Sequence, residues 1–194
     1  MSDVPKVIRA EAFHLVAPDG TLRASLEVLP DGMAGLILLD KEGKPRASLA
    51  VSPDGTPGFG LFDKDGNGRA RLRVSPDGMT GLVLCDKDGM RRAELGVDAD
   101  GTPGLGLRDK DEKPRAGVGL SPDGRPGLSL FDKDGKERAT LCLLAEDMLS
   151  LNLWDKDGKS RATLVVVTDG TPRFLLYDKD GKVIWESPVA WATA

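Results

Sequence analysis

The sequence has no glutamine, and its 194 residues include only one histidine, two cysteines and one tyrosine. The single histidine, His14, lies between Phe13 and Leu15 on the outer side of the first predicted strand, and we interpret it as a surface residue, with no material for a catalytic triad or for a metal site of several histidines. Cys85 and Cys142 are too few for a disulfide framework. We therefore predict a protein that is not an enzyme, with no catalytic residues and no cofactor.

Long hydrophobic runs and a charge excess of one sign are also missing. No stretch of about 20 apolar residues could span a membrane as a helix, and the start MSDVPKVIRA has no apolar signal-peptide core. Charged residues make up 30% with a net charge of -4, whereas nucleic-acid-binding domains are usually basic. We expect no nucleic acid partner and no membrane insertion. A cytoplasmic location is the default, with non-classical export or a phage particle left open.

What the sequence does contain is a strict repeat of 23 residues with two turn signals. The last residue of the DKDG signal, or its replacement, falls at Gly20, Gly43, Gly66, Gly89, Glu112, Gly135, Gly158 and Gly181. The last residue of the PDG signal falls at Gly32, Gly55, Gly78, Gly101, Gly124, Asp147 and Gly170. We predict one repeat domain of about eight units over residues 7–187, a frayed N-terminus at 1–6 and a tail at 188–194.

Each unit contains two short runs in which apolar residues alternate with others, which is typical of half-buried strands. Asp65-Gly66 suits a two-residue turn, or a four-residue loop in the same register, and Ser75–Gly78 suits a three-residue loop with a bulge. With Lys64 paired to Asn67, Leu61 faces Ala70 and Phe59 faces Leu72; with Ser75 paired to Met79, Leu72 faces Leu82. On the opposite side this register places Phe62 against Arg69.

Both turns thus leave the leucines on one side of the sheet, which predicts an all-β fold of tandem β-hairpins in an elongated antiparallel meander. The alternative is a single-chain β-solenoid with one unit per coil. That arrangement stacks identical residues, so Arg69 would lie beside Arg92 and Arg46, and such like-charge neighbours destabilise a ladder. We favour the meander.

A single-layered sheet leaves its apolar side uncovered, and a sheet has to bury that side against something. We expect a homo-oligomer, with a trimer around a threefold axis favoured over a face-to-face dimer. The side predicted to be covered includes Leu36, Leu38, Ala47, Leu49, Phe59, Leu61, Ala70, Leu72, Leu82, Leu84, Ala93 and Leu95.

Two turns break the pattern. Glu112 replaces a glycine, and a side chain at positive φ is unfavourable. We predict that Lys110–Lys113 widens into a turn without positive φ. Ala145-Glu146-Asp147 has neither proline nor glycine, so its hairpin should also differ from its neighbours.

The one candidate metal site is DKDGNG, where Asp63, Asp65 and Asn67 match the first half of an EF-hand loop and could ligate Ca²⁺. The closing glutamate is missing, because Val74 stands at the twelfth position. We interpret the three residues as turn residues and predict no metal. The recurring arginines could bind a polyanion, but the interleaved acids favour a self-paired surface.

The segments DKDGKxRAxLxV and PDGxPGLxLxD, with the ending YDKDGKVIW at Tyr177–Trp185, resemble uncharacterised bacterial tandem β-hairpin repeat proteins. The resemblance covers nearly the whole chain and implies no activity. In architecture alone the unit is also similar to MORN and YD repeats. We expect a non-catalytic structural or scaffolding protein. The alternative is a binding module whose outer side holds a glycan, a peptide or another extended polymer.

Overall fold

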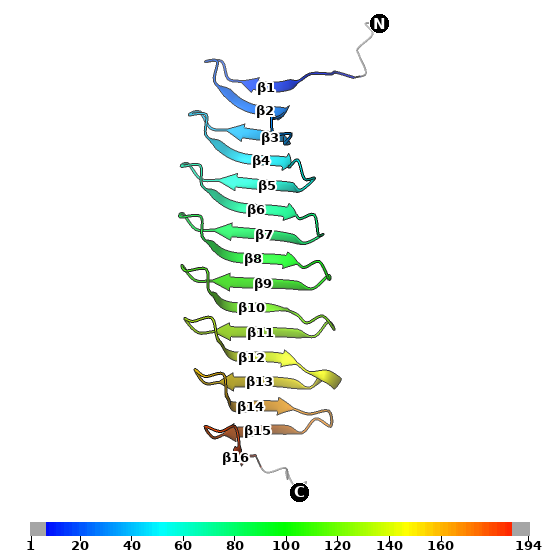
Figure 1. The fold of residues 1–194 in the computed structure, drawn as a ribbon, viewed down its shortest axis with the longest axis vertical. Coiled ribbons are helices and arrows are strands. Elements are labelled where there is room, and N and C mark those ends of the chain that lie inside the picture. The colour runs from blue at the N-terminus through cyan, green and yellow to red at the C-terminus, as the bar shows by residue number, and fades with distance from the viewer. Residues whose placement is uncertain (1–6, 188–194) are drawn as a thin grey trace. The chain divides into compact units, whose positions relative to one another are not determined.

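The computed structural model describes residues 7–187 and consists of antiparallel strands that hydrogen-bond in the order in which they occur in the chain (Figure 1). This confirms the meander of hairpins. The solenoid alternative is wrong, because each strand pairs with its neighbours in sequence and not with its equivalent in the next repeat. The predicted frayed N-terminus and the predicted tail lie outside the described residues.

The chain forms two compact units, Met1–Gly89 and Met90–Ala194. The first unit contains β1 (Ala12–Val16), β2 (Leu22–Val28), β3 (Ala34–Leu39), β4 (Pro45–Val51), β5 (Pro57–Phe62), β6 (Gly68–Val74) and β7 (Thr80–Cys85). The second contains β8 (Arg91–Val97), β9 (Pro103–Arg108), β10 (Pro114–Leu120), β11 (Pro126–Phe131), β12 (Glu137–Leu143), β13 (Leu149–Trp154), β14 (Ser160–Val166), β15 (Pro172–Tyr177) and β16 (Val183–Glu186).

The predicted strand register is confirmed in the middle of the strands. Phe59 lies opposite Leu72, and Leu61 lies opposite Ala70 across β5 and β6. Leu72 in turn lies opposite Leu82 across β6 and β7. Since paired residues share a side of the sheet, the leucines of successive strands in each unit form one continuous apolar side.

The DKDG turn differs from the predicted two-residue form. Asp63 N–H donates to the Asn67 carbonyl at 3.0 Å and Gly66 N–H donates to the Asp63 carbonyl at 3.1 Å. This is a three-residue loop, the same kind as at the PDG turn, where Ser75 N–H donates to the Met79 carbonyl at 2.8 Å. The final loop residue, Gly66, has φ of 87°, a left-handed conformation that favours glycine.

A three-residue DKDG loop would put the arginine of the returning strand on the leucine side, and a β-bulge prevents this. Phe62 pairs with Gly68 while Leu61 pairs with Ala70, so Arg69 is an extra residue in β6. The predicted Phe62–Arg69 pair is therefore wrong by one residue. Equivalent bulges occur at Arg23, Arg46, Arg115, Arg138, Arg161 and Ile184.

The two irregular turns have opposite outcomes. The hairpin at Ala145–Asp147 departs from its neighbours as predicted, because it forms a 3-10 turn with Glu146 and Asp147 both at positive φ. Its second hydrogen bond runs from Met148 N–H to the Ala145 carbonyl at 3.5 Å. No other helix of any kind occurs within residues 7–187.

The prediction for Glu112 is wrong. Glu112 has φ of 59°, and its N–H donates to the Asp109 carbonyl at 3.1 Å, as the glycines do in the matching turns. The flanking strands and the Asp109 N–H bond to Lys113, 2.9 Å long, hold the loop in its usual shape. The Glu112 carboxylate also accepts hydrogen bonds from Arg91 N–H at 3.0 Å and from Arg91 Nε at 3.3 Å.

Each unit is a single-layered sheet with almost no interior. Among the described residues only Ala24, Ser25, Gly60, Cys85 and Ser150 are buried. The large apolar side chains that would form the core of a globular domain are largely exposed, which leaves one side of each sheet without a packing partner.

Glu112 leads to a prediction about stability. An L-residue in the left-handed region costs about 1 kcal/mol relative to glycine. We expect Gly66→Glu to lower the free energy of unfolding by about this amount, because the position equivalent to Arg91 in the preceding repeat is Pro45, which has no N–H and no cationic side chain. Urea denaturation followed by circular dichroism measures the change. Glu112→Gly is the matched control and should leave stability equal or slightly higher; a clear loss there would contradict the assignment of strain.

Candidate functional site

The sheet offers two chemically different sides. The apolar face comprises Leu26, Leu36, Leu38, Leu49, Phe59, Leu61, Leu72 and Leu84 in the first unit, and Leu95, Leu105, Leu107, Val118, Leu128, Leu130, Leu141, Leu153 and Leu164 in the second. The outer face is the opposite side and carries the repeated arginines Arg23, Arg46, Arg69, Arg92, Arg115, Arg138 and Arg161.

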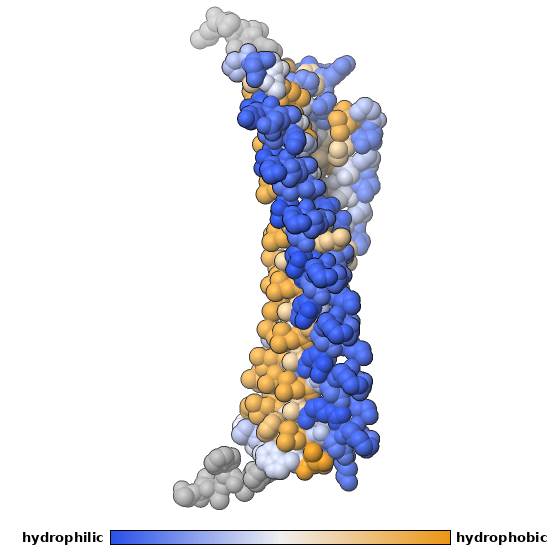
Figure 2. Space-filling model, turned by 90° about the vertical axis from the view of Figure 1, so that its left-hand side faces the viewer, coloured by the Kyte–Doolittle hydropathy of each residue, from blue (hydrophilic) through white to orange (hydrophobic). Residues whose placement is uncertain are grey.

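The apolar face is open to solvent in the single chain. Leu49 is 58% exposed, Leu95 54% and Leu164 47%. Figure 2 shows hydrophobic side chains gathered on one part of the surface, beside hydrophilic side chains. Exposed apolar patches of this extent mark sites of interaction in soluble proteins.

The bulge aims each repeated arginine over its own turn and toward the neighbouring strand. Arg138 Nε donates to the Trp154 carbonyl at 2.9 Å, and its Nη1 lies 3.5 Å from Asp132 Oδ2. Arg46 makes the same two contacts, to the Phe62 carbonyl at 3.2 Å and to Asp40 at 3.7 Å. The repeated arginines are therefore engaged by groups of the sheet itself, which agrees with the self-paired interpretation of this column.

The first aspartate of each DKDG signal organises its loop. Asp155 Oδ1 accepts the Asp157 N–H at 2.8 Å and the Lys159 N–H at 3.0 Å. The Lys159 N–H, then the Asp157 N–H and the Arg161 guanidinium, lower the pKa of Asp155 to about 2. The Lys136 N–H likewise lowers the pKa of Asp132 from its ordinary value. These carboxylates are structural acceptors within the turns.

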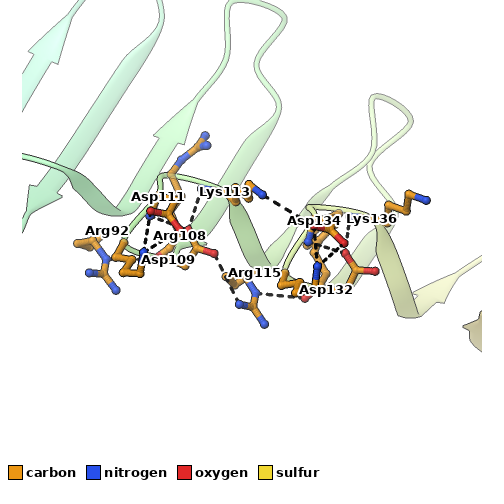
Figure 3. A network of polar contacts seen from close by, with 12 residues as sticks. Arg92, Arg108, Asp109, Asp111, Lys113, Arg115, Asp132, Asp134 and Lys136 are labelled. Carbon is orange, nitrogen blue, oxygen red and sulfur yellow. Dashed lines mark hydrogen bonds and ion pairs between the residues drawn. The ribbon is translucent and has the colours of Figure 1, made fainter. Parts of the chain in front are cut away.

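Successive DKDG turns also contact one another, as Figure 3 shows for two turns of the second unit. Lys113 Nζ lies 4.0 Å from Asp134 Oδ1 in the following turn. Lys136 Nζ then donates to the Lys156 carbonyl at 3.1 Å. The row of turns is thus a self-contained network of charges on the surface of the unit.

The calcium candidate residues serve the turn in the same way. Asp63 Oδ1 accepts the N–H groups of Asp65 and Asn67 at 2.9 and 3.0 Å, and its Oδ2 accepts Asn67 Nδ2 at 3.3 Å. Asp65 pairs with Lys64 at 2.9 Å. Residues 7–187 contain no group of three or more His, Cys, Asp or Glu side chains that could hold a metal ion.

The other rare side chains lie apart. His14 is exposed on the outer face of β1 opposite Ser25. Cys85 and Cys142 are free thiols in different units, the first buried and the second half-buried. These positions bring no nucleophile together with a base.

Comparisons with known proteins add little. No protein-family model and no curated protein matches the chain. The TCP domain of SAS-4 (dCPAP) from Drosophila melanogaster, solved with a proline-rich motif of Ana2 (dSTIL), is similar at a TM-score of 0.47 and 12% identity over 90% of this chain and 95% of that one. The wild-type TCP10 domain of Danio rerio CPAP, solved with a peptide of Danio rerio STIL, gives a TM-score of 0.27 and 18% identity over 91% and 98%. Both TM-scores lie below 0.5, so neither likeness supports a functional argument.

As for membranes, residues 7–187 contain no helix with the length and apolar character needed to cross a bilayer.

The two contacts of Arg138 predict that a positive charge alone does not maintain the stability of the protein at the bulge. Arg138→Lys keeps the cation but cannot reach both the Trp154 carbonyl and Asp132 with a rigid planar group. We expect the free energy of unfolding to fall by about 1 kcal/mol, the usual contribution of one hydrogen bond, as measured by urea denaturation with tryptophan fluorescence. The control is Lys133→Arg at an exposed turn position, which should have no effect; equal stability of both variants would contradict the two-contact role.

The lowered pKa of Asp155 predicts a pH dependence. Its folded-state pKa is depressed, so its stabilising effect is complete above the unfolded value of about 3.9 and is lost as the pH falls toward 2. We expect Asp155→Asn to lower the melting temperature by a few degrees at pH 7, with the difference from the native protein shrinking between pH 4 and pH 2. Asp157→Asn is the control, because Asp157 contacts the exposed Lys156 side chain; an equal effect in both variants would refute the prediction.

Proposed function

We propose that this protein is a non-catalytic structural protein whose copies assemble through their apolar faces. The observation that carries the proposal is the exposure of that face. It presents several apolar residues per repeat, and each buried leucine contributes roughly 1.5–3 kcal/mol.

The surface area of the chain supports assembly. The chain exposes 13555 Å², whereas a compact monomer of 20.6 kDa exposes about 8,900 Å². Permanent subunit interfaces typically bury about 2,000–5,000 Å² in total. Because each chain contributes about half of that area, the excess is of the size that two such interfaces per chain would remove, as in a ring of three.

A second copy of the same chain is the occupant that fits best. The face repeats every 23 residues, so two copies offer the same spacing of side chains along their whole length. Strands of six or seven residues are about 20 Å long. Three sheets of that width can meet around an axis with their leucines in contact, and we therefore propose a trimer ahead of a dimer.

The second candidate function is a binding module, and the glycine content of the outer face favours it. Gly58 of β5 has no side chain and is half-buried, so that a ligand can approach the backbone there, whereas Gly60 is buried beneath the Phe62 ring. This function and assembly are compatible, because they use opposite sides of the sheet.

Two substitutions on neighbouring residues of β14 test assembly. Leu164 belongs to the apolar face and Thr163 to the outer face. We expect the native protein to scatter light with about three times the 20.6 kDa mass of one chain. Leu164→Asp should reduce the mass to that of one chain or prevent folding, because it places a charge in the proposed interface.

Thr163→Asp is the matched control and should keep the native mass, with circular dichroism reporting the fold of both variants. A folded native monomer at micromolar concentration would overturn the proposed assembly, as would loss of the oligomer in Thr163→Asp but not in Leu164→Asp.

A further inference from the structure

Strand β6 differs from every equivalent strand in the array by two additional arginines on its outer face. Arg71 and Arg73 follow the bulged Arg69 at alternate positions. The equivalent pairs are Ser25 and Glu27 in β2, and Ser48 and Ala50 in β4. The two extra cations are therefore a local addition to the repeat and serve no role common to all units.

Neither arginine is paired within residues 7–187. Arg69 contacts Asp63 at 3.7 Å and the Cys85 carbonyl at 3.0 Å, whereas Arg71 and Arg73 make no hydrogen bond and no ion pair within 4.0 Å in this described part of the chain. Arg73 acts on Asp77 through its charge alone: the Ser75 hydroxyl is the main group that lowers the pKa of Asp77, and Arg73 adds the smallest effect. Both arginine side chains are exposed.

These arginines form one wall of a groove of about 260 Å³ on the outer face of the first unit. Two rows of paired residues cross it: Ser48, Gly60 and Arg71 in one row, and Ala50, Gly58 and Arg73 in the other. Gly58 of β5 and the Phe62 ring, which covers the buried Gly60, form the floor, and β4 and β6 are about 9.6 Å apart. The groove therefore runs parallel to the strands.

The ends of the groove are also defined. A Cβ at Gly60 would lie 3.2 Å from the Phe62 ring and 3.1 Å from Ser48 Oγ, so the ring closes one end over this glycine. Ser52 and Thr56 line the other end. Ser48 and Ala50 on one side and the two guanidinium groups on the other give an open groove with one positive wall.

We propose that this groove binds an acidic peptide segment in an extended conformation, with carboxylates on alternate residues. Guanidinium groups bind carboxylates through paired hydrogen bonds. Arg71 and Arg73 are two residues apart on a strand, about 6.7 Å, and alternate side chains of an extended peptide have the same spacing. The intervening peptide side chains then point toward Ser48 and Ala50 of β4.

This site is independent of the proposed assembly. It lies on the outer face, so it stays accessible when the apolar face is covered. Removal of the groove arginines should not change the mass of the protein in solution. A failure of peptide binding can therefore be distinguished from a failure of assembly.

The test uses a fluorescein-labelled peptide of eight residues in which glutamate and serine alternate, with binding followed by fluorescence anisotropy. The double variant Arg71→Ser/Arg73→Ala gives β6 the residues that β4 carries, so the scaffold already accepts them. We expect its affinity to be at least about ten-fold weaker than that of the native protein, the loss of more than one charge-assisted contact. Raised salt should weaken native binding as well.

The matched control also removes two cations. Arg125→Thr/Arg173→Ser changes residues that are paired with Asp123 and Glu186 into those that stand at Thr102 and Ser150 in other repeats. We expect this control to bind the peptide within about two-fold of the native affinity. If overall charge alone governed binding, both double variants would lose affinity to the same extent. Light scattering and circular dichroism should show the same mass and fold for all three proteins.

A second peptide with four glutamates followed by four serines tests the spacing and should bind more weakly. Equal binding of both peptides, equal loss in both double variants, or native affinity in Arg71→Ser/Arg73→Ala would overturn the proposal. So would binding of inorganic phosphate or polygalacturonate in place of the alternating peptide.

Discussion

The constraint on which this structure depends is the two-residue period of a β-strand. Every hairpin has to return its leucines to the side from which they came, since a shift of one residue moves them all to the other side. The PDG loop does this directly, as Leu72 opposite Leu82 shows. The DKDG loop does not, and the extra residue Arg69 in β6 corrects the shift. The same arginine then supplies the neighbouring strand with a hydrogen-bond donor.

The loops and bulges keep the strands in register, so the sheet forms without a second layer packed against it. Backbone bonds and arginine contacts join neighbouring strands, and the turn residues join one hairpin to the next, which is typical of repeat arrays. The apolar face is consequently regular but unused by the chain itself, and the proposed assembly follows from that. Residues on the outer face differ from one repeat to another, and Arg71 and Arg73 are the clearest example.

Alternation and turn residues were enough to predict the strands, the meander and the mid-strand register. They could not predict the bulge, because Arg69 follows the turn directly and fits either a two-residue loop or a longer loop with an extra residue. Glu112 was misjudged because the shape of its turn is set by Asp109 and by the flanking strands. The groove could have been suspected from RARLRV, the one returning strand with arginines at three alternate positions, but its floor depends on the register with β5.

Ile184 stands where the preceding repeats place arginine, and it belongs to β16, the last strand of the described residues. Each arginine thus accompanies a following strand whose carbonyl it satisfies, and the contact is absent where no such strand follows within residues 7–187. Every repeat therefore brings its own loop, bulge and connection to the next. Duplication or deletion of one 23-residue unit keeps the reading frame and would preserve the contacts that all units share. A gene of this kind can widen or narrow the sheet of its product by one hairpin at a time, about 9.6 Å for two strands.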